Sequence, residues 1–196
     1  ADEDPVFTHK QFELFDSIVE SIPGRDEKFH VHLSNSAGLL DYHSRTTNLV
    51  RPGLLIYGIS PLPAHQEFLR PVMTFKSRVS VINHLPKGHG VSYGRTILER
   101  DTKAAILGLG YGDGYPRSLS GKGTSVVLNN SLCPLLGRVT MDQIIVDVTE
   151  LDECHPGDEA ELFGSNLLVS DLAKKAGTIP WEILTQITPR VTRVYR

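Results

Sequence analysis

The sequence predicts a chain in two parts, a short α/β segment followed by an antiparallel β domain of sandwich or barrel type. Before about residue 68, helix-like and strand-like stretches alternate in the order helix, strand, helix, strand, which is typical of parallel βα units. From about Pro71 the chain becomes a series of short β-rich runs separated by Gly, Pro and Asn turns, which is typical of antiparallel sheets. We therefore divide the chain into residues 1–68 and 69–196.

The α/β segment opens with a predicted amphipathic helix over residues 8–22, with Thr8 as its expected N-cap. A short buried strand over residues 29–33, a small-residue turn that opens a second helix, and a strand over residues 48–50 follow. Two βα units cannot close a sheet or a barrel by themselves.

The β domain is predicted from five β-rich runs and a helical region near its end. Ser170 is expected to cap a helix that stops at Gly177, and Pro180 is expected to open another. The closing residues 190–195 alternate like a strand. The five predicted strands cover residues 72–81, 104–109, 124–128, 143–148 and 159–163.

Composition excludes several classes of function. A chain of 196 residues, 40% of them hydrophobic, can bury one substantial core or two small ones. The net charge of -3 and the scattered Lys and Arg residues do not resemble a nucleic-acid binder. Cys133 and Cys154 have no metal-ligand spacing and make no disulfide scaffold, so we expect a reducing cytoplasm.

The chain shows no sign of membrane insertion or export. No apolar run approaches the roughly 20 residues that span a bilayer, and the opening residues lack the features of a signal peptide. A start at Ala1, without an initiator Met, predicts that the natural chain begins earlier.

Polar and small residues follow each of the two predicted parallel strands. Loops at such strand ends in (β/α)8 barrels commonly build a phosphate site from backbone N–H groups and small side chains, a role that suits Ser36, Gly53 and Leu54. Arg51 and His32 would flank that site and hydrogen-bond a heteroaromatic ring or another anion. Alternatively, Asn35 and Ser36 only cap a helix, and Arg51 is solvated or ion-paired.

The stretch Lys-Gly-His-Gly-Val-Ser-Tyr-Gly-Arg-Thr, residues 87–96, presents Tyr93 between glycines that tolerate unusual backbone angles. An exposed phenol there can hydrogen-bond or act as a general base. Taken alone, the stretch favours a hairpin corner whose Tyr caps a β core. Two later loops, residues 110–117 and 137–143, combine glycines with aromatic and charged residues, and each is also consistent with a surface hairpin or with polar groups that satisfy the backbone.

Taken in order, these motifs are specific. They read His-x-x-Asn-Ser, Arg-Pro-Gly-x-x-x-Tyr-Gly, Gly-Val-Ser-Tyr-Gly-x-Thr, Gly-Tyr-x-Asp-Gly-Tyr-x-Arg, Gly-Arg-Val-x-Met-Asp-Gln, Glu-Ile-Leu-Thr and Arg-Val-x-Arg-Val-Tyr. Over essentially its whole length, the chain resembles the C-terminal half of an alanine racemase. The resemblance implies the last βα units of a pyridoxal-phosphate-binding (β/α)8 barrel, then the family's C-terminal β domain. It also implies a homodimer that interconverts L- and D-alanine for cell-wall (peptidoglycan) synthesis.

The resemblance also implies roles for the cofactor and base positions. Tyr93 matches a catalytic base that acts opposite the cofactor lysine and serves the neighbouring subunit. Arg51 matches the residue at the pyridine nitrogen, with His32 as its hydrogen-bond partner. Ser36, Gly53 and Leu54 match the phosphate cradle, and Asn35 belongs to the same cofactor-binding group.

The remaining matches concern the substrate. Met141 matches a residue whose backbone N–H receives the substrate carboxylate, with Asp142 beside it. Tyr111 matches an aromatic residue at the mouth of the active site. Arg138 and Asp2 match charged residues of the entry corridor.

Two features depart from the family pattern. Trp181 stands where members commonly carry a Tyr that reaches the cofactor phosphate, so a broader racemase of serine or other small amino acids is an alternative. The cofactor-lysine motif is absent, and Lys87 does not match it. We therefore expect the segment to be inactive alone, with the N-terminal half as a possible separate partner. A non-catalytic β module for dimerisation is the alternative of a different class.

Overall fold

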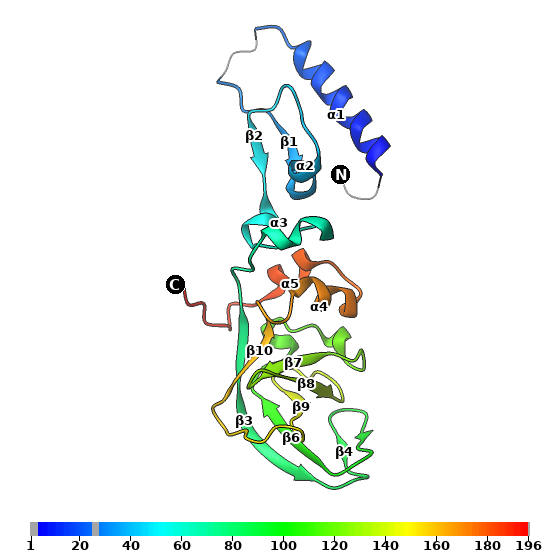
Figure 1. Ribbon diagram of the computed structural model, residues 1–196, viewed down its shortest axis with the longest axis vertical. Coiled ribbons are helices and arrows are strands. Elements are labelled where there is room, and N and C mark those ends of the chain that lie inside the picture. Colours follow the sequence, from blue (N-terminus) through cyan, green and yellow to red (C-terminus); the bar gives the residue numbers. More distant parts are fainter. Residues whose placement is uncertain (1–3, 25–27, 196) are drawn as a thin grey trace. The chain divides into compact units, whose positions relative to one another are not determined.

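The computed structural model of the chain describes residues 4–24 and 28–195 (Figure 1). The chain forms two compact units, Ala1–Val72 and Met73–Arg196. The first is a small α/β unit and the second is an antiparallel β domain, which confirms the predicted fold class. No helix in the described ranges has the length and apolar character needed to cross a membrane.

The α/β unit is built around a pair of parallel strands (Figure 1). Strands β1 and β2 pair in a register that sets His32 opposite Leu49 and Asn35 opposite Arg51. The predicted parallel βα units are therefore present, displaced by one to three residues at their ends. The elements of this unit are α1 (Pro5–Glu20), β1 (His32–Asn35), α2 (Ser36–Asp41), β2 (Leu49–Arg51), α3 (Gly53–Ile56) and the 3-10 helix η1 (Pro63–Phe68).

The N-cap of α1 is Asp4, not Thr8. A carboxylate oxygen of Asp4 accepts the backbone N–H of Phe7 at 2.9 Å, and Pro5 occupies the first helical position, where its missing N–H does no harm. Thr8 lies inside the helix and is buried. The prediction was wrong because helical periodicity locates the apolar face of a helix but not its first turn.

Asp16 ties α1 to the loop before β2. Asp16 is buried, with only 2% of its surface exposed. Its carboxylate accepts hydrogen bonds from the hydroxyl of Ser44 at 2.6 Å, the hydroxyl of Thr46 at 2.7 Å and the backbone N–H of Arg45 at 3.1 Å. Burial alone would raise the pKa of this carboxyl, but these hydrogen bonds outweigh it and lower the pKa to about 2. Asp16 is therefore a structural anion.

The β domain is a closed barrel with the strand order β10-β3-β6-β9-β8-β7 (Figure 1). Every strand pair is antiparallel. Because β10 also pairs with β7, the sheet closes, and of the two predicted forms, sandwich or barrel, the domain is a barrel. Its interior is filled by fully buried residues such as Leu107, Leu128, Ile144, Val146 and Leu162. The barrel strands are β3 (Phe75–Leu85), β6 (Thr102–Leu107), β7 (Ser125–Leu128), β8 (Ser131–Leu136), β9 (Ile144–Asp147) and β10 (Glu159–Phe163).

Strand β8 was missed because it contains Pro134, which lowers the expectation of a central strand. The bridge to β9 begins only at Leu135, so Pro134 needs no backbone donor on that side. The two short strands β4 (Gly90–Val91) and β5 (Thr96–Ile97), which form a small antiparallel sheet, were also not predicted.

The ends of the helical region differ slightly from prediction. Helix α4 (Val169–Ala176) begins one residue before Ser170, with Leu168 as its N-cap, and ends as expected at Gly177 in the left-handed conformation. Helix α5 (Pro180–Gln186) opens on proline as predicted. Residues 190–195 form no strand, because no described strand pairs with this segment. The remaining 3-10 helices are η2 (Tyr111–Asp113) and η3 (Arg117–Leu119).

The Asp16 cluster predicts how stability depends on pH. Because the folded-state pKa of about 2 lies below the unfolded value of 3.8, the charged group stabilises the fold fully above about pH 5 and loses this contribution as the pH falls toward 2. Asp16→Asn should lower the free energy of unfolding at pH 7 by about 2 kcal/mol and flatten its dependence between pH 5 and 2.

Urea titrations followed by far-UV circular dichroism measure both effects. The matched control is Asp171→Asn, which removes an exposed carboxylate whose partner in the described part of the chain is Lys174, one turn away. Equal changes in the two variants would contradict the role assigned to Asp16.

Candidate functional site

In the α/β unit, the hydroxyl of Ser36 connects α2 to the start of α3. Its oxygen accepts the backbone N–H of Leu54 at 3.0 Å and that of Leu55 at 3.4 Å, and the residue is buried. The hydroxyl proton has no acceptor among the described residues and is available to a ligand. Beside it, a side chain at Gly53 would meet nothing within 4 Å. The structure thus brings Ser36, Gly53 and Leu54 together.

These groups fit a phosphate, with one adjustment. The Ser36 hydroxyl proton and the backbone N–H of Gly53 are donors that point at no protein acceptor in the described part of the chain. The backbone N–H of Leu54 already donates to the Ser36 hydroxyl, so it orients that hydroxyl and would not itself contact a phosphate. Asn35 caps α2 by accepting the N–H of Gly38 at 2.9 Å, which is the structural role left open by the sequence.

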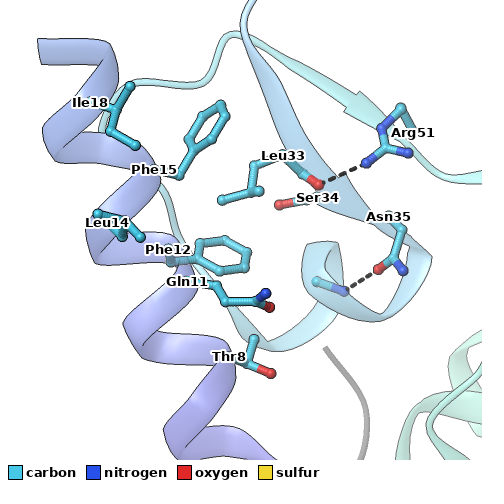
Figure 2. A pocket seen from close by; sticks show the side chains of 11 residues that line it. Thr8, Gln11, Phe12, Leu14, Phe15, Ile18, Leu33, Ser34, Asn35 and Arg51 are labelled. Carbon is cyan, nitrogen blue, oxygen red and sulfur yellow. Dashed lines mark hydrogen bonds between the residues drawn. The ribbon is translucent and has the colours of Figure 1, made fainter.

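Arg51 lies at the end of β2, and its guanidinium donates to the backbone carbonyl of Leu33 at 3.0 Å (Figure 2). Within the described ranges it makes no hydrogen bond to His32, the partner expected from the sequence. The bond to Leu33 uses one donor of the five on the guanidinium, and the exposed side chain keeps the others available.

A cavity of about 390 Å³ lies between α1 and β1, and Figure 2 shows Phe12 and Phe15 of α1 directed toward Leu33 of β1. Arg51 and Asn35 line the polar side of this cavity. Ser36, Gly53 and Leu54 do not line it, so this apolar space is separate from the phosphate-like cradle.

In the β domain, Tyr93 stands on the β4–β5 hairpin, 72% exposed. The hairpin-corner topology is therefore right, but the Tyr is presented outward and caps no core. Ser92 anchors the corner: its hydroxyl donates to the carbonyl of Arg138 at 2.7 Å and accepts the backbone N–H of Arg138 at 3.1 Å. The guanidinium of Arg138 packs against Gly94, where an added Cβ would lie 2.9 Å from it.

The loop that carries Tyr111 is pressed against the segment that carries Met141. The backbone N–H of Tyr111 donates to the carbonyl of Thr140 at 3.0 Å, and that of Gly112 donates to the carbonyl of Met141 at 2.9 Å. A Cβ on Gly110 would lie 2.1 Å from the carbonyl oxygen of Thr140, so only glycine permits this approach. Tyr111 and Met141 are both partly exposed on the resulting surface.

Arg190 closes this cluster from the end of the chain. Its guanidinium contacts a carboxylate oxygen of Asp142 at 2.6 Å and one of Asp113 at 3.3 Å. The other oxygen of Asp113 accepts the N–H of Gly110 at 2.9 Å. The backbone N–H of Met141 finds no acceptor among the described residues, so it remains available to an anion.

Two further predicted positions complete the description. Trp181 lies in the first turn of α5 with its side chain partly exposed. Asp2, expected in an entry corridor, lies outside the described residues.

Sequence reasoning missed Ser92 and Arg190 as residues that hold the candidate site together. For Ser92, the Ser-Tyr-Gly order was a usable signal, since a small hydroxyl before a presented Tyr often anchors a turn. For Arg190, the alternating pattern of residues 190–195 pointed to a strand and concealed its ion pairs.

Comparison with known protein families identifies both units. Residues 72–195 match the family model described as alanine racemase, C-terminal domain. Residues 1–61 match the model described as alanine racemase, N-terminal domain.

Individual relatives agree. A Vibrio vulnificus alanine racemase is 41% identical over 192 residues, covering 96% of this chain and 52% of that protein. The solved alanine racemase of Streptomyces lavendulae, a D-cycloserine producer, is 36% identical with a TM-score of 0.89, covering 100% of this chain and 53% of its own. The alanine racemase of Bartonella henselae, solved with covalently bound pyridoxal phosphate, is 31% identical with a TM-score of 0.88, covering 100% of this chain and 54% of its own. The chain spans about half the length of the curated relatives it matches.

The contact at Gly110 yields a stability prediction. Gly110→Ala places a Cβ against backbone atoms that cannot rotate away, so it should lower the free energy of unfolding by about 3 kcal/mol. The control is Gly121→Ala, where φ is +71° but no atom lies within 4 Å, so only the left-handed strain of about 1 kcal/mol is expected. Urea midpoints compare the two, and equal losses would show that the close approach is not a constraint.

Proposed function

This chain belongs to the alanine racemase family, and on that premise we propose that the protein of which it forms about half interconverts L- and D-alanine with the aid of pyridoxal 5'-phosphate. The observation that carries the proposal is the docked hairpin, which holds Tyr93 outward on a corner anchored through Ser92. A phenol placed in this way is available to a substrate bound outside its own unit.

The cofactor would be held by residues of the α/β unit. The Ser36 hydroxyl and the Gly53 backbone N–H would donate to its phosphate, with Leu54 orienting the Ser36 oxygen. Arg51 would donate to the ring nitrogen and, because a guanidinium keeps its proton, would leave that nitrogen unprotonated. When bound, the cofactor supplies an electron-withdrawing group that acidifies the α-hydrogen of an amino acid.

Tyr93 would act as the proton-transfer group on one face of the substrate. Its oxygen would take the proton from the α-carbon of one enantiomer and return a proton in the reverse direction. A second base must act on the opposite face, and in this family that is the cofactor lysine, whose motif is absent from the chain. We therefore propose that the segment alone is inactive.

The substrate carboxylate would be received by the backbone N–H of Met141, which has no acceptor within the described part of the protein. Asp142 would lie beside it, and Tyr111, on the loop bonded to Met141, would line the entrance. The Arg138 guanidinium against the Tyr93 hairpin would attract anionic substrates.

We propose a homodimer in which the hairpin serves the site of the neighbouring subunit. The outward placement of Tyr93 supports this arrangement. The N-terminal half, with the cofactor lysine, would be supplied by the same polypeptide or as a separate fragment. The two free, buried cysteines support a cytoplasmic setting.

Trp181 supports a second candidate function, a racemase that accepts serine or another small amino acid. An indole in the first turn of α5 is bulkier than the family's usual Tyr and carries only a donor. A changed pocket wall would alter the preference of the enzyme between substrates with a methyl side chain and substrates with a hydroxymethyl side chain.

The role of Tyr93 is tested in the full-length protein. Tyr93→Phe should lower turnover about 10²- to 10⁴-fold in at least one direction, because the variant cannot take or give a proton. Chiral chromatography of alanine from each enantiomer measures it. The control, Tyr195→Phe, removes an exposed phenol near the chain end and should not change turnover. Unchanged turnover in the Tyr93 variant would favour a non-catalytic β module.

Substrate choice is tested with a panel of L-amino acids. We expect kcat/KM for alanine to exceed that for serine at least about tenfold, because a pocket shaped for a methyl group pairs no hydroxyl. Trp181→Tyr should widen the preference if the indole is what admits serine. Equal use of alanine and serine would replace the alanine-specific proposal with the broader racemase.

A further inference from the structure

Arg190 sits between two carboxylates on the surface where the proposed function binds the substrate carboxylate. Its guanidinium contacts Asp142 at 2.6 Å and Asp113 at 3.3 Å. It also packs against Gly112, where an added Cβ would be 2.6 Å from a guanidinium nitrogen. The side chain is therefore fixed against the loop rather than free in solvent, although about half of its surface is exposed.

The ion pair between Arg190 and Asp142 affects the charge beside Met141. Asp142 is the next residue after Met141, so its carboxylate belongs to the residue directly beside the Met141 backbone N–H. The side chain of Asp142 is mostly exposed, and among the described residues it pairs with Arg190. Without that partner, an anionic carboxylate would face the carboxylate of any amino acid approaching Met141.

We propose that Arg190 is a positioning residue for substrate binding: it neutralises and holds Asp142 and Asp113 so that the Met141 N–H can receive a carboxylate. This inference rests on the proposed function and deepens it. Removing the Arg190 charge should raise KM while leaving kcat much less changed, because the repulsion acts on substrate entering the site and not on the proton transfer.

The geometry distinguishes this electrostatic role of Arg190 from a purely structural one. Other bonds already hold the segments: the hydroxyl of Thr188 donates to the carbonyl of Gly112 at 3.0 Å, and its backbone N–H donates to the carbonyl of Asp113 at 3.2 Å. The loop is thus attached to the final segment independently of Arg190. What Arg190 adds is a positive charge set between two negative ones.

The test uses the full-length protein loaded with pyridoxal phosphate. Arg190→Met should raise KM for alanine about tenfold, because it leaves the nearby carboxylate of Asp142 without its compensating charge. It should raise the inhibition constant of acetate, the smallest carboxylate probe, by a similar factor. Both effects should shrink as the salt concentration increases. Arg190→Lys, which keeps the charge, should recover most of the loss.

A double-mutant cycle isolates the charge. In an Asp142→Asn background, Arg190→Met should raise KM by no more than about threefold, because the repelling carboxylate is already gone. The matched control is Arg193→Met: this guanidinium belongs to the same segment but donates to the carbonyl of Ile187 and contacts neither aspartate. Its KM should stay within about twofold of wild type.

The outcomes separate this inference from the proposed function. If the wild-type protein does not racemise alanine, the proposed function fails. If it is active, the inference is overturned by an unchanged KM in Arg190→Met. It is equally overturned if Arg190→Lys is as impaired as Arg190→Met, if Asp142→Asn gives no relief, or if only kcat falls.

Discussion

The bare α-carbon of Gly110 is the constraint on which the candidate site of the β domain depends. Because no side chain stands there, the backbone of Tyr111 and Gly112 can bond directly to the carbonyls of Thr140 and Met141. These bonds place the Tyr111 segment beside the Met141 backbone N–H, which has no acceptor within the described ranges. The final segment then bonds to the same loop through Thr188 and Arg190. Residues far apart in sequence become one surface only because their backbones touch.

Single serine hydroxyls perform the corresponding task at the other two clusters. Ser92 both donates to and accepts from the backbone of Arg138, and so fixes the corner that presents Tyr93. Ser36 accepts the N–H groups at the start of α3, and its own proton has no acceptor among the described residues. A hydroxyl suits both positions because it can accept one hydrogen bond and donate another.

Much of the fold was predictable from local pattern. The change from βα alternation to short β runs located the change of architecture, and the strand at residues 159–163 has the predicted bounds. Helix ends were less predictable, because capping by Asp4 or Leu168 depends on which backbone groups lack partners and not on apolar spacing. The strand containing Pro134 escaped prediction because a proline is tolerated or excluded according to its neighbours, which a single sequence does not show.

By itself the sequence determined the kind of domain and the resemblance to alanine racemases. It did so because hydrophobic period, glycine placement and ordered motifs are properties of neighbouring residues. Only the tertiary structure decided that Arg51 bonds to Leu33, that Ser92 anchors Tyr93 and that Arg190 lies between Asp113 and Asp142. These contacts join residues up to 77 positions apart, and they follow from barrel closure and backbone contact, which no local pattern records.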